Sequence, residues 1–572
     1  MGRCLIINSR HIVVWYNSIA IKINLIVGGT MFKKLSLLAV ITWVVVCLVA
    51  YYFVLPPINI TSFAFWAFFG PAIIIPIVLL TQTYSLKDGF NQGKAFYPMA
   101  IVIVSVVIFF VGMVIASPVF NSKIYTERIN VVPSSFEEDI KPVDFDNLPL
   151  LDKASTQKVG DRIVGQIPDL VSQFSVSDEY SLINYQGSIV RVTPLEHNGL
   201  FKYFANSNGT AGYVVVDSTT GVASLTRLED GLKYLPSSYF FQNLRRHVQI
   251  GNPFEILGAF SFELDEEGNP YWIIQTLKYT WVGMKKEVKG VIIVDAVNGD
   301  MQKYGVGEEV PRWVDNVYDA ALITEEIDSW GLYQGGYLNS VFSQKNVTQA
   351  TRGYTYITMN DDVYMYTGIT SVSSDESNIG FIMVNLRTHD ALFYAVPGAE
   401  EYSAMDSAVG AVQEKNYIST FPLLINLNNR PTYLVSLKDA AGLVKMYAFV
   451  DVQNYQKVST SDVSLGIEAA ANTFLQMMGT GDLEQSELFE KTFTIAALNP
   501  VIVDGNTYYY LESTENERFS VLASINLAVT PYLKVNDTVN CQYKITSAGI
   551  NSVIIIELVT QVAEETAPIV EE

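Results

Sequence analysis

Three long apolar runs near the N-terminus constrain the fold of this chain more than any other feature of its sequence. The first, from Leu35 to Leu55, carries no charge. At about 1.5 Å of rise per residue, a helix over this run can cross a hydrocarbon core of roughly 30 Å. A second run extends from Phe63 to about Leu80 and a third from Phe96 to about Ala116. We therefore predict three membrane-spanning helices within residues 31–118.

The basic residues beside these runs predict the orientation of the chain. They lie before the first run and between the second and third, at Lys33, Lys34, Lys87 and Lys94. The loop 56–62, between the first two runs, has no charge. By the positive-inside rule the basic segments stay in the cytoplasm, so three crossings place residue 119 and all that follows outside. The runs contain no ionisable residue, which favours an anchor or a docking surface over a transporter.

The first 30 residues have the character of a mispredicted leader. Met31 is followed by Phe-Lys-Lys and an apolar run, which is a typical start for a bacterial membrane protein. The four preceding residues, Val27 to Thr30, can be encoded by a ribosome-binding site just upstream of an ATG codon. We therefore predict that translation starts at Met31. The alternative is that residues 1–30 form a real amphipathic leader.

The charge of the chain is concentrated after the apolar runs. The whole sequence has 37 basic and 58 acidic residues, of which residues 1–118 hold only seven and one, so residues 119–572 carry a net charge of −27. Such a domain repels phosphate backbones, which excludes nucleic acid as a partner. Of the three cysteines only Cys541 lies in this part, so it has neither an intrachain disulfide nor a cysteine-based zinc site.

After a polar tether at 119–151, four units repeat the same order of a helix followed by strands. Units 1 and 2 occupy residues 152–309, and units 3 and 4 occupy residues 310–478. In each unit the last apolar strand ends on a short polar side chain: Asp217, Asp295, Asn385 and Asp451. A glycine follows two of these residues four positions later, which indicates a hairpin turn capped by the side chain. We favour this structural role over a metal-binding or catalytic one.

The closing strands also carry a resemblance to known families. Units that end in Val-Val-Asp-x-x-Thr/Asn-Gly, as in "GYVVVDSTTG", resemble PepSY domains, which are small extracytoplasmic modules of bacterial proteins. The stretches "RVTPLEHNGLFKYF", "DESNIGFIMVN", "GAEEYSAMDSA" and "GLVKMYAFVDVQNYQ" are similar to an uncharacterised family of Firmicutes multi-pass membrane proteins. The second resemblance brings no known activity. The first implies a part in inhibiting or modulating peptidases of the cell envelope.

The C-terminal part of the chain has a different pattern. Several short apolar segments between residues 488 and 560, with a turn at Asp504-Gly505-Asn506, predict a small β-barrel of the OB type. Residues 561–572 are acidic and are predicted to be a disordered tail.

A search for chemistry finds no strong motif. There is no HExxH, GxSxG, GxxxxGK[ST] or CxxC pattern. Weak candidates are an anion-binding trio on a helix, two acidic pairs that could form a calcium loop, and an acidic cluster at a helix N-terminus: Arg245-Arg246-His247, Asp361-Asp362 with Asp375-Glu376, and Glu400-Glu401 with Asp406. The three histidines of the large domain, His197, His247 and His389, are widely separated from one another in sequence. For each candidate we favour an ordinary surface or helix-end role, so no catalytic, cofactor-binding or metal-binding residue is predicted.

These observations predict a membrane-anchored α+β protein with three N-terminal membrane helices, four PepSY-like units and an OB-like barrel. We expect it in a bacterial cell membrane, with most of the chain outside the cytoplasm. The favoured function is non-enzymatic: the domain would bind or regulate an envelope protein or peptide, without a cofactor. The alternatives are an envelope hydrolase with an unrecognised site and an accessory subunit of a membrane transport complex.

Overall fold

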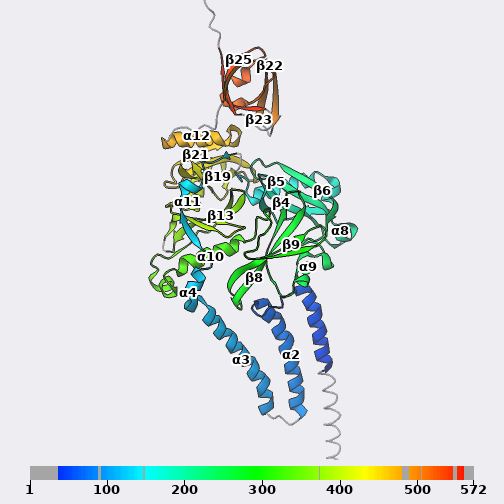
Figure 1. The fold of residues 1–572 in the computed structure, drawn as a ribbon. Coiled ribbons are helices and arrows are strands. Elements are labelled where there is room, and N and C mark those ends of the chain that lie inside the picture. The colour runs from blue at the N-terminus through cyan, green and yellow to red at the C-terminus, as the bar shows by residue number, and fades with distance from the viewer. Residues whose placement is uncertain are drawn as a thin grey trace, which may run out of the picture.

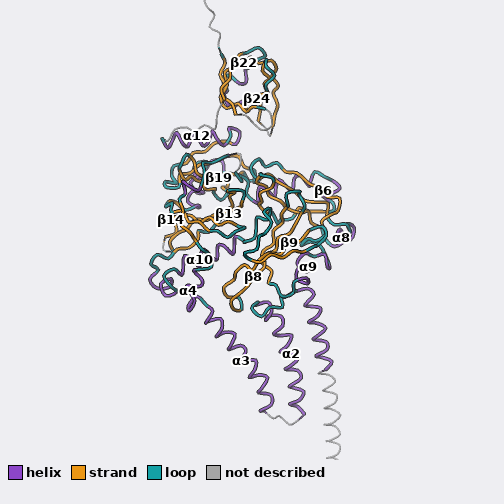
Figure 2. The backbone as a smooth tube through the Cα atoms, in the orientation of Figure 1, coloured by secondary structure: helices purple, strands orange, loops and turns teal. Residues whose placement is uncertain are grey.

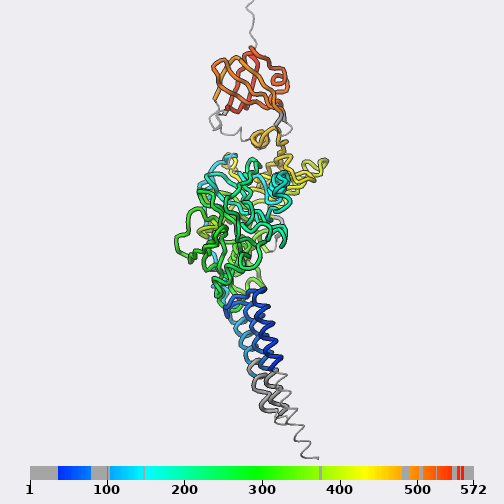
Figure 3. The backbone as a smooth tube through the Cα atoms, turned by 90° about the vertical axis from the view of Figure 1, so that its right-hand side faces the viewer, coloured from blue at the N-terminus to red at the C-terminus, as the bar shows by residue number. Residues whose placement is uncertain are grey.

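The computed structural model describes residues 37–87, 92–145, 148–372, 374–479, 489–503, 506–544 and 550–559. Figure 1 shows helices at one end of the molecule, a body of β-sheets in the middle and a small barrel at the other end. Seen from the side in Figure 3, these three parts follow one another along the length of the molecule. The leader 1–30, the start at Met31 and the tail 561–572 lie outside the described residues.

The prediction of three membrane-spanning helices is wrong. Within the described residues, one helix, over Leu37–Val54, is long and apolar enough to cross a membrane. The apolar part of α2 (Phe63–Lys87) covers only Phe63–Val78; it rises about 24 Å, less than a hydrocarbon core of roughly 30 Å. α3 (Gln92–Ala116) meets α4 (Pro118–Thr126) at a bend of 47°, and passes the same test only when the two count as one bent span.

The balance of secondary structure also differs from the predicted α+β class. Strands hold 38% of the described residues and helices 32%, so β-sheet is the larger share of the structure. Figure 2 shows that strands fill the body and the barrel, whereas the long helices stand apart from them. The sheets form because the strand segments alternate buried and exposed side chains, or are buried on both faces where two sheets pack together.

The segment 119–151, predicted as a polar tether, is folded onto the body. It contains α4, β1 (Val131–Ser134) and α5 (Phe136–Asp139). β1 pairs in parallel with β15 (Ala391–Tyr394). Farther along, the Val143 N–H donates to the carbonyl oxygen of Asn426 at 2.8 Å. The segment 119–151 therefore joins the last two sheets of the body, and we call it the strap.

Units 1 and 2 each form one antiparallel sheet, and the two sheets share a core. The first sheet has the order β2-β4-β5-β6 with β3 beside β4, and the second has the order β10-β9-β8-β7. The strands of the first are β2 (Phe174–Val176), β3 (Ser181–Tyr185), β4 (Ser188–His197), β5 (Thr210–Asp217) and β6 (Ala223–Leu232). Those of the second are β7 (Ile256–Leu264), β8 (Pro270–Trp281), β9 (Met284–Asp295) and β10 (Met301–Gly305). The helices here are α6 (Lys153–Gly165), α7 (Pro168–Val171), α8 (Leu200–Ala205) and α9 (Leu244–Gly251). Buried Val192, Phe262 and Trp272 lie in the shared core.

Units 3 and 4 also form one sheet each and share a core, but the third sheet includes the parallel pair of β1 and β15. The third sheet has the order β1-β15-β14-β13-β11, with β12 beside β13 and β16 beside β14, and the fourth has the order β17-β19-β20-β21, with β18 beside β19. The further strands of the third are β11 (Thr348–Ala350), β12 (Thr355–Met359), β13 (Asp362–Ser371), β14 (Ser374–Asn385) and β16 (Gly398–Ala399). Those of the fourth are β17 (Ile418–Ser419), β18 (Leu423–Leu427), β19 (Arg430–Lys438), β20 (Val444–Asp451) and β21 (Val458–Asp462). The helices are α10 (Ala320–Tyr333), α11 (Glu401–Gly410) and α12 (Ile467–Met478). Tyr366, Tyr433 and Phe449 are buried in the core between these sheets.

The C-terminal segment forms a closed barrel of five strands, as predicted. Its order is β22-β23-β24-β26-β25, with one parallel pair between β24 and β26. The strands are β22 (Phe489–Val503), β23 (Asn506–Ser513), β24 (Arg518–Leu522), β25 (Thr538–Lys544) and β26 (Asn551–Leu558). Cys541 is buried in the barrel core.

Three of the four strand-closing residues cap turns, as predicted. The Oδ1 atom of Asp217 accepts hydrogen bonds from the backbone N–H groups two and three positions later, at 2.9 and 2.7 Å. Asp295 does the same at 2.7 and 3.0 Å, and Asn385 at 2.8 and 3.0 Å. Gly221 and Gly299 then adopt φ of 74° and 84°, a region that glycine enters without steric cost.

The fourth closing residue, Asp451, acts differently. It accepts only one backbone hydrogen bond, from Gln453 at 3.4 Å. Its carboxylate is instead held by the Arg430 guanidinium, through Nε at 3.2 Å and Nη2 at 3.0 Å. The Asp451 side chain is 2% exposed, so it is one half of a buried ion pair more than a turn cap.

Candidate functional site

The body encloses a cavity of about 490 Å³ at the place where the four sheets meet. Every unit contributes to its wall. Examples are Arg191 from β4, Ser261 from β7, Gln275 from β8, Tyr356 from β12, Leu423 from β18 and Ser436 from β19. Ligand sites are concave and lie preferentially between domains, so this junction is the best candidate for a functional site among the described residues.

Strand β4 places an arginine in the interior of the body, at the cavity wall. The strand is buried on both of its faces, so side chains of either face lie inside the protein. Each residue from Ile189 to Leu195 is buried, and β3 and β5 pair along its two edges. Arg191 lies opposite Leu182 of β3 and Val216 of β5, so its neighbours in the sheet are apolar. The strand thus carries a cation into the interior.

Arg191 makes no hydrogen bond or ion pair within the described part of the chain. The residue is only 7% exposed, and its Nε atom is buried without a hydrogen-bond partner. Burial lowers the pKa of the Arg191 guanidinium, and the nearby Tyr356 and Asp152 oppose that shift. Burying an ionised group costs several kcal/mol unless a partner compensates it, and buried arginines are normally paired. This arginine is the most unusual group of the cavity.

The acids beside Arg191 are engaged elsewhere. Asp152 pairs with Lys438 at 2.6 Å and accepts from the Ser155 N–H at 2.9 Å. Burial raises the pKa of Asp152, but the bonds from Lys438 and Ser155 outweigh it and the pKa is lowered. Asp319 caps α10 through the Ala321 N–H at 3.0 Å. Asp152 therefore compensates Lys438, and Asp319 is engaged as a helix cap, so neither forms an ion pair with Arg191.

A pair of buried acids lies directly behind the cavity wall. Glu263 is fully buried and accepts from the Asp315 N–H at 2.8 Å. It also accepts from two residues of the wall, Ser261 Oγ at 2.8 Å and Asn316 Nδ2 at 3.0 Å. Burial raises the pKa of Glu263, and burial together with the charge of Glu263 raises the pKa of Asp315 well above its usual value. The protonation of this pair is thus linked to two side chains that line the cavity.

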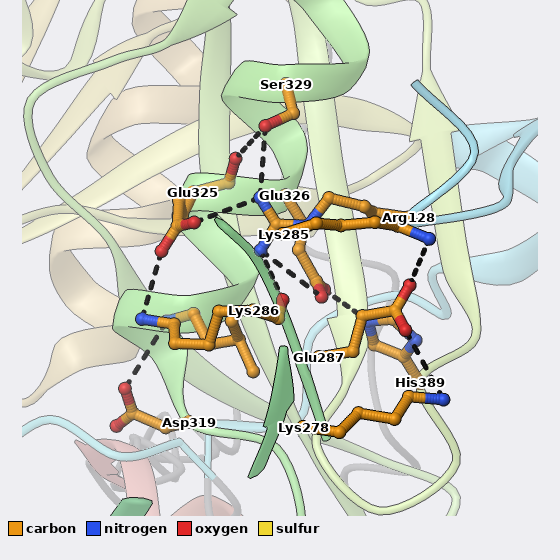
Figure 4. A network of polar contacts seen from close by, with 11 residues as sticks. Arg128, Lys278, Lys285, Lys286, Glu287, Asp319, Glu325, Glu326, Ser329 and His389 are labelled. Carbon is orange, nitrogen blue, oxygen red and sulfur yellow. Dashed lines mark hydrogen bonds and ion pairs between the residues drawn. The ribbon is translucent and has the colours of Figure 1, made fainter. Parts of the chain in front are cut away.

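A second charged cluster, shown in Figure 4, joins the strap to the body. The Arg128 side chain is 1% exposed and donates from Nη1 to Glu325 Oε1 at 3.0 Å and to Ser329 Oγ at 3.2 Å. Its Nη2 donates to the carbonyl oxygen of Lys286 at 2.7 Å, and the Lys286 ammonium pairs with Glu325 Oε2 at 3.0 Å. These charges are mutually compensated, so the cluster holds α10 against β9 and the strap and leaves no charge for a ligand.

The structure does not bring the three histidines of the large domain together. His389 Nε2 lies 2.7 Å from Glu326 Oε2, on the α10 side of the Figure 4 cluster. His247 Nε2 lies 2.7 Å from the carbonyl oxygen of Gly299. Burial lowers the pKa of His197 to about 4, so this ring is neutral. Each histidine therefore has its own structural setting.

The anion-binding trio at residues 245–247 is not assembled either. The Arg246 guanidinium lies 4.3 Å from the centre of the Tyr52 ring and donates to the Tyr52 carbonyl oxygen at 3.3 Å. Arg246 thus fastens α9 to the C-terminal end of the first helix, whereas the His247 ring contacts the carbonyl oxygen of Gly299. The solvated helix face expected for this trio is seen only at the exposed Arg245, since Arg246 and His247 are half-buried.

The acidic candidates whose side chains the structure describes form no metal site. Asp362 pairs with Arg387 and accepts from Asn385 Nδ2 at 2.8 Å. The side chains of Asp375 and Glu376 lie outside the described part. Glu401 is the first residue of α11, as expected from its acidic helix start, but it is fully buried, and burial raises its pKa. Across the described residues, no group of three or more His, Cys, Asp or Glu side chains could hold a metal ion.

Sequence reasoning missed Arg191, and a signal for it was present. In "SIVRVTPLEH" a single arginine interrupts an otherwise apolar strand pattern, with valines on either side. A charge in the middle of a strand that is apolar at successive positions indicates a buried and functional cation. The other wall residues, such as Ser436 and Gln275, have no comparable local signal.

Comparison with known proteins does not identify the family of this chain. No family model and no curated protein match it. Among solved structures, a crystal structure of an alpha-L-arabinofuranosidase from Lactobacillus brevis aligns with 73% of this chain and 97% of its own, at 8% identity and a TM-score of 0.16. A likeness this low carries no argument about fold or activity.

Proposed function

We propose that this chain is an envelope protein anchored by its N-terminal helix, and that its acidic body lies outside the cytoplasm and binds an envelope component without transforming it. The observation that carries the proposal is the cavity of about 490 Å³ at the junction of the four sheets. Its size falls within the range of pockets that bury small ligands. The net charge of −27 in residues 119–572 argues against a nucleic-acid partner.

A binding role fits the cavity better than a hydrolytic one. Its wall includes neither a histidine nor a cysteine among the described residues. Ser261 is hydrogen-bonded to Glu263, but that carboxylate already accepts from Asp315 and Asn316, and burial raises its pKa. A general base must be free to take a proton from the nucleophile. Glu263 is held in place as a structural acceptor.

Two experiments test the proposal. The first places a cysteine at the exposed turn residue Thr220 and treats intact cells with a membrane-impermeant thiol reagent. The native Cys541 is buried and Cys47 lies in the apolar helix, and the remaining cysteine, Cys4, is replaced by serine, so background labelling will be low. Labelling of Thr220→Cys before permeabilisation supports an outward-facing body. Labelling only after permeabilisation would place the body in the cytoplasm.

The second experiment captures the ligand. Purified full-length protein is incubated with a soluble envelope extract, separated by gel filtration and denatured, and the released compounds are identified by mass spectrometry. Ala259→Trp fills the cavity from β7, and Ser224→Trp places the same ring on the exposed face of β6 as a matched control. We expect a compound that is retained by wild type and Ser224→Trp and lost from Ala259→Trp. Equal retention by all three proteins, or release of a chemically altered compound, would contradict the proposal.

A further inference from the structure

We infer that the cavity recognises the carboxylate group of a small ligand, and that Arg191 is the residue that pairs with it. This inference rests on the proposed binding function and adds the class of the ligand. The geometry behind it is a buried guanidinium on the wall of a cavity, with no hydrogen bond or ion pair to any described residue.

The first step is the energetic cost of leaving Arg191 alone. A buried charge without a partner is strongly unfavourable, and a carboxylate supplied by a ligand would relieve this cost only in the bound state. The planar guanidinium presents two parallel N–H groups, which match the two oxygens of a carboxylate. An arginine that served only packing would be replaceable by an apolar side chain of similar length.

The second step distinguishes a carboxylate from a phosphate. The wall includes a second cation, the exposed Lys153, and the acid Asp152, which pairs with Lys438 at 2.6 Å. Asp319 and the exposed Glu179 contribute negative charge around the cavity. A phosphate monoester carries a charge of about −1.5 to −2 near neutral pH, which Arg191 and Lys153 cannot balance beside these two acids inside an acidic domain. A carboxylate carries a single charge, and Arg191 balances it.

The third step concerns the rest of the ligand. Aromatic rings from three different sheets line the same cavity: Phe260 of the second, Tyr354 and Tyr356 beside or within the third, and Phe421 next to the fourth. The rings of Tyr354 and Tyr356 are 5.7 Å apart and perpendicular to within about 20°. Aromatic walls of this kind favour a ligand whose remaining part is flat or apolar, because its rings can pack against them in offset-stacked or edge-to-face arrangements. The ligand we expect is therefore a small organic monocarboxylate with an aromatic or apolar part.

Binding of defined probes to the full-length protein in detergent tests this inference. The probes are 3-phenylpropionate, indole-3-acetate and N-acetylphenylalanine, each with its neutral amide, and phenyl phosphate. Calorimetry should detect at least one of the carboxylates, with the matching amide at least about thirtyfold weaker, the scale of about 2 kcal/mol for an unpaired buried charge. Arg191→Gln should lose the carboxylate by a similar factor. Arg227→Gln, on β6 of the same sheet and paired at the surface with Asp169, should bind as wild type does.

Stability measurements keep the inference falsifiable when no probe binds. In ligand-free buffer, Arg191→Met should unfold at a higher temperature than wild type, because it removes an uncompensated buried charge. A lower unfolding temperature for Arg191→Met would show that the arginine is compensated within the fold and would overturn the inference. So would equal affinity for acid and amide, preference for phenyl phosphate, or unchanged carboxylate binding in Arg191→Gln. Capture of a neutral compound from the envelope extract would refute the carboxylate as the ligand class but would still support the proposed binding function.

Discussion

Replacing the strand-closing acids by asparagine should separate turn caps from ion-pair residues. Asp295 and Asp451 occupy corresponding positions in units 2 and 4, and both end an apolar strand. Asp295 accepts two backbone hydrogen bonds, at 2.7 and 3.0 Å. It forms no ion pair with any described residue. Asp451 accepts one weak backbone bond and is paired with Arg430. The same substitution therefore removes different interactions at the two positions.

The expected magnitudes follow from these contacts. Asp295→Asn keeps an oxygen acceptor, so the free energy of unfolding should change by less than about 0.5 kcal/mol; Asn385 already fills this role in unit 3. Asp295→Ala removes two hydrogen bonds of about 1 kcal/mol each, for a loss of roughly 1–2 kcal/mol. Asp451→Asn leaves Arg430 without its carboxylate and should cost about 3 kcal/mol. At about 2 °C for each kcal/mol, the order of unfolding temperatures is wild type and Asp295→Asn, then Asp295→Ala, then Asp451→Asn.

Thermal unfolding of the four full-length proteins in the same detergent, followed by tryptophan fluorescence, checks this order. Urea unfolding of each protein gives the free energies. If Asp295→Asn abolished ligand retention while its unfolding temperature stayed at the wild-type value, the carboxylate charge itself would have a binding or catalytic role. If Asp451→Asn were as stable as wild type, the buried ion pair would contribute nothing.

Three further predictions concern buried charges and turn geometry. The pKa values of Glu263 and Asp315 are raised in the folded state, so at pH values above the ordinary carboxyl range the native protein binds more protons than the unfolded chain, and stability is lost as the pH rises. Asp315→Asn should therefore gain stability relative to wild type between about pH 5 and pH 8, measured by urea unfolding at each pH. Parallel stability curves for the two proteins would refute this linkage. Arg128→Met removes three hydrogen bonds, to Glu325, Ser329 and the carbonyl oxygen of Lys286, and should lower the free energy of unfolding by about 3 kcal/mol, and a neutral effect would show that the strap does not depend on these bonds. Gly299→Ala places a side chain at a φ of 84° and should cost about 1–3 kcal/mol, whereas an unchanged melting curve would mean that the turn relaxes.

Local patterns in the sequence were sufficient for several parts of this protein. The turn caps at Asp217 and Asp295 follow from a short acid after an apolar strand and a glycine four residues later, and the hydrogen bonds are those expected. The first apolar run does form a helix that can cross a membrane. The closed barrel near the C-terminus was likewise predictable from its short strands and turns. All of these features depend on residues close together in the chain.

The same local reasoning failed where helix length, bending or packing decided the outcome. Apolar composition suggested three membrane helices, but the apolar part of α2 is too short and α3 bends by 47° into α4. The polar segment before unit 1 suggested a tether, yet β1 within it pairs with β15. A polar composition shows only that the residues of a segment tolerate contact with water. Whether the segment pairs as a strand depends on whether the edge of a neighbouring strand is free to bond with it.

The sequence by itself determined where strands end, which turns are capped and that an apolar helix precedes an acidic, sheet-rich body, because those properties arise from neighbouring residues and their periodicity. Only the tertiary structure decided which charges are compensated. The bond between Asp152 and Lys438 joins residues 286 positions apart, and it is this bond that removes the nearest acid from Arg191. Whether a buried arginine is a structural ion pair or a ligand-binding group thus depends on the packing of four sheets against one another, since a charge is stabilised by whatever lies within a few ångströms of it and not by its neighbours in the chain.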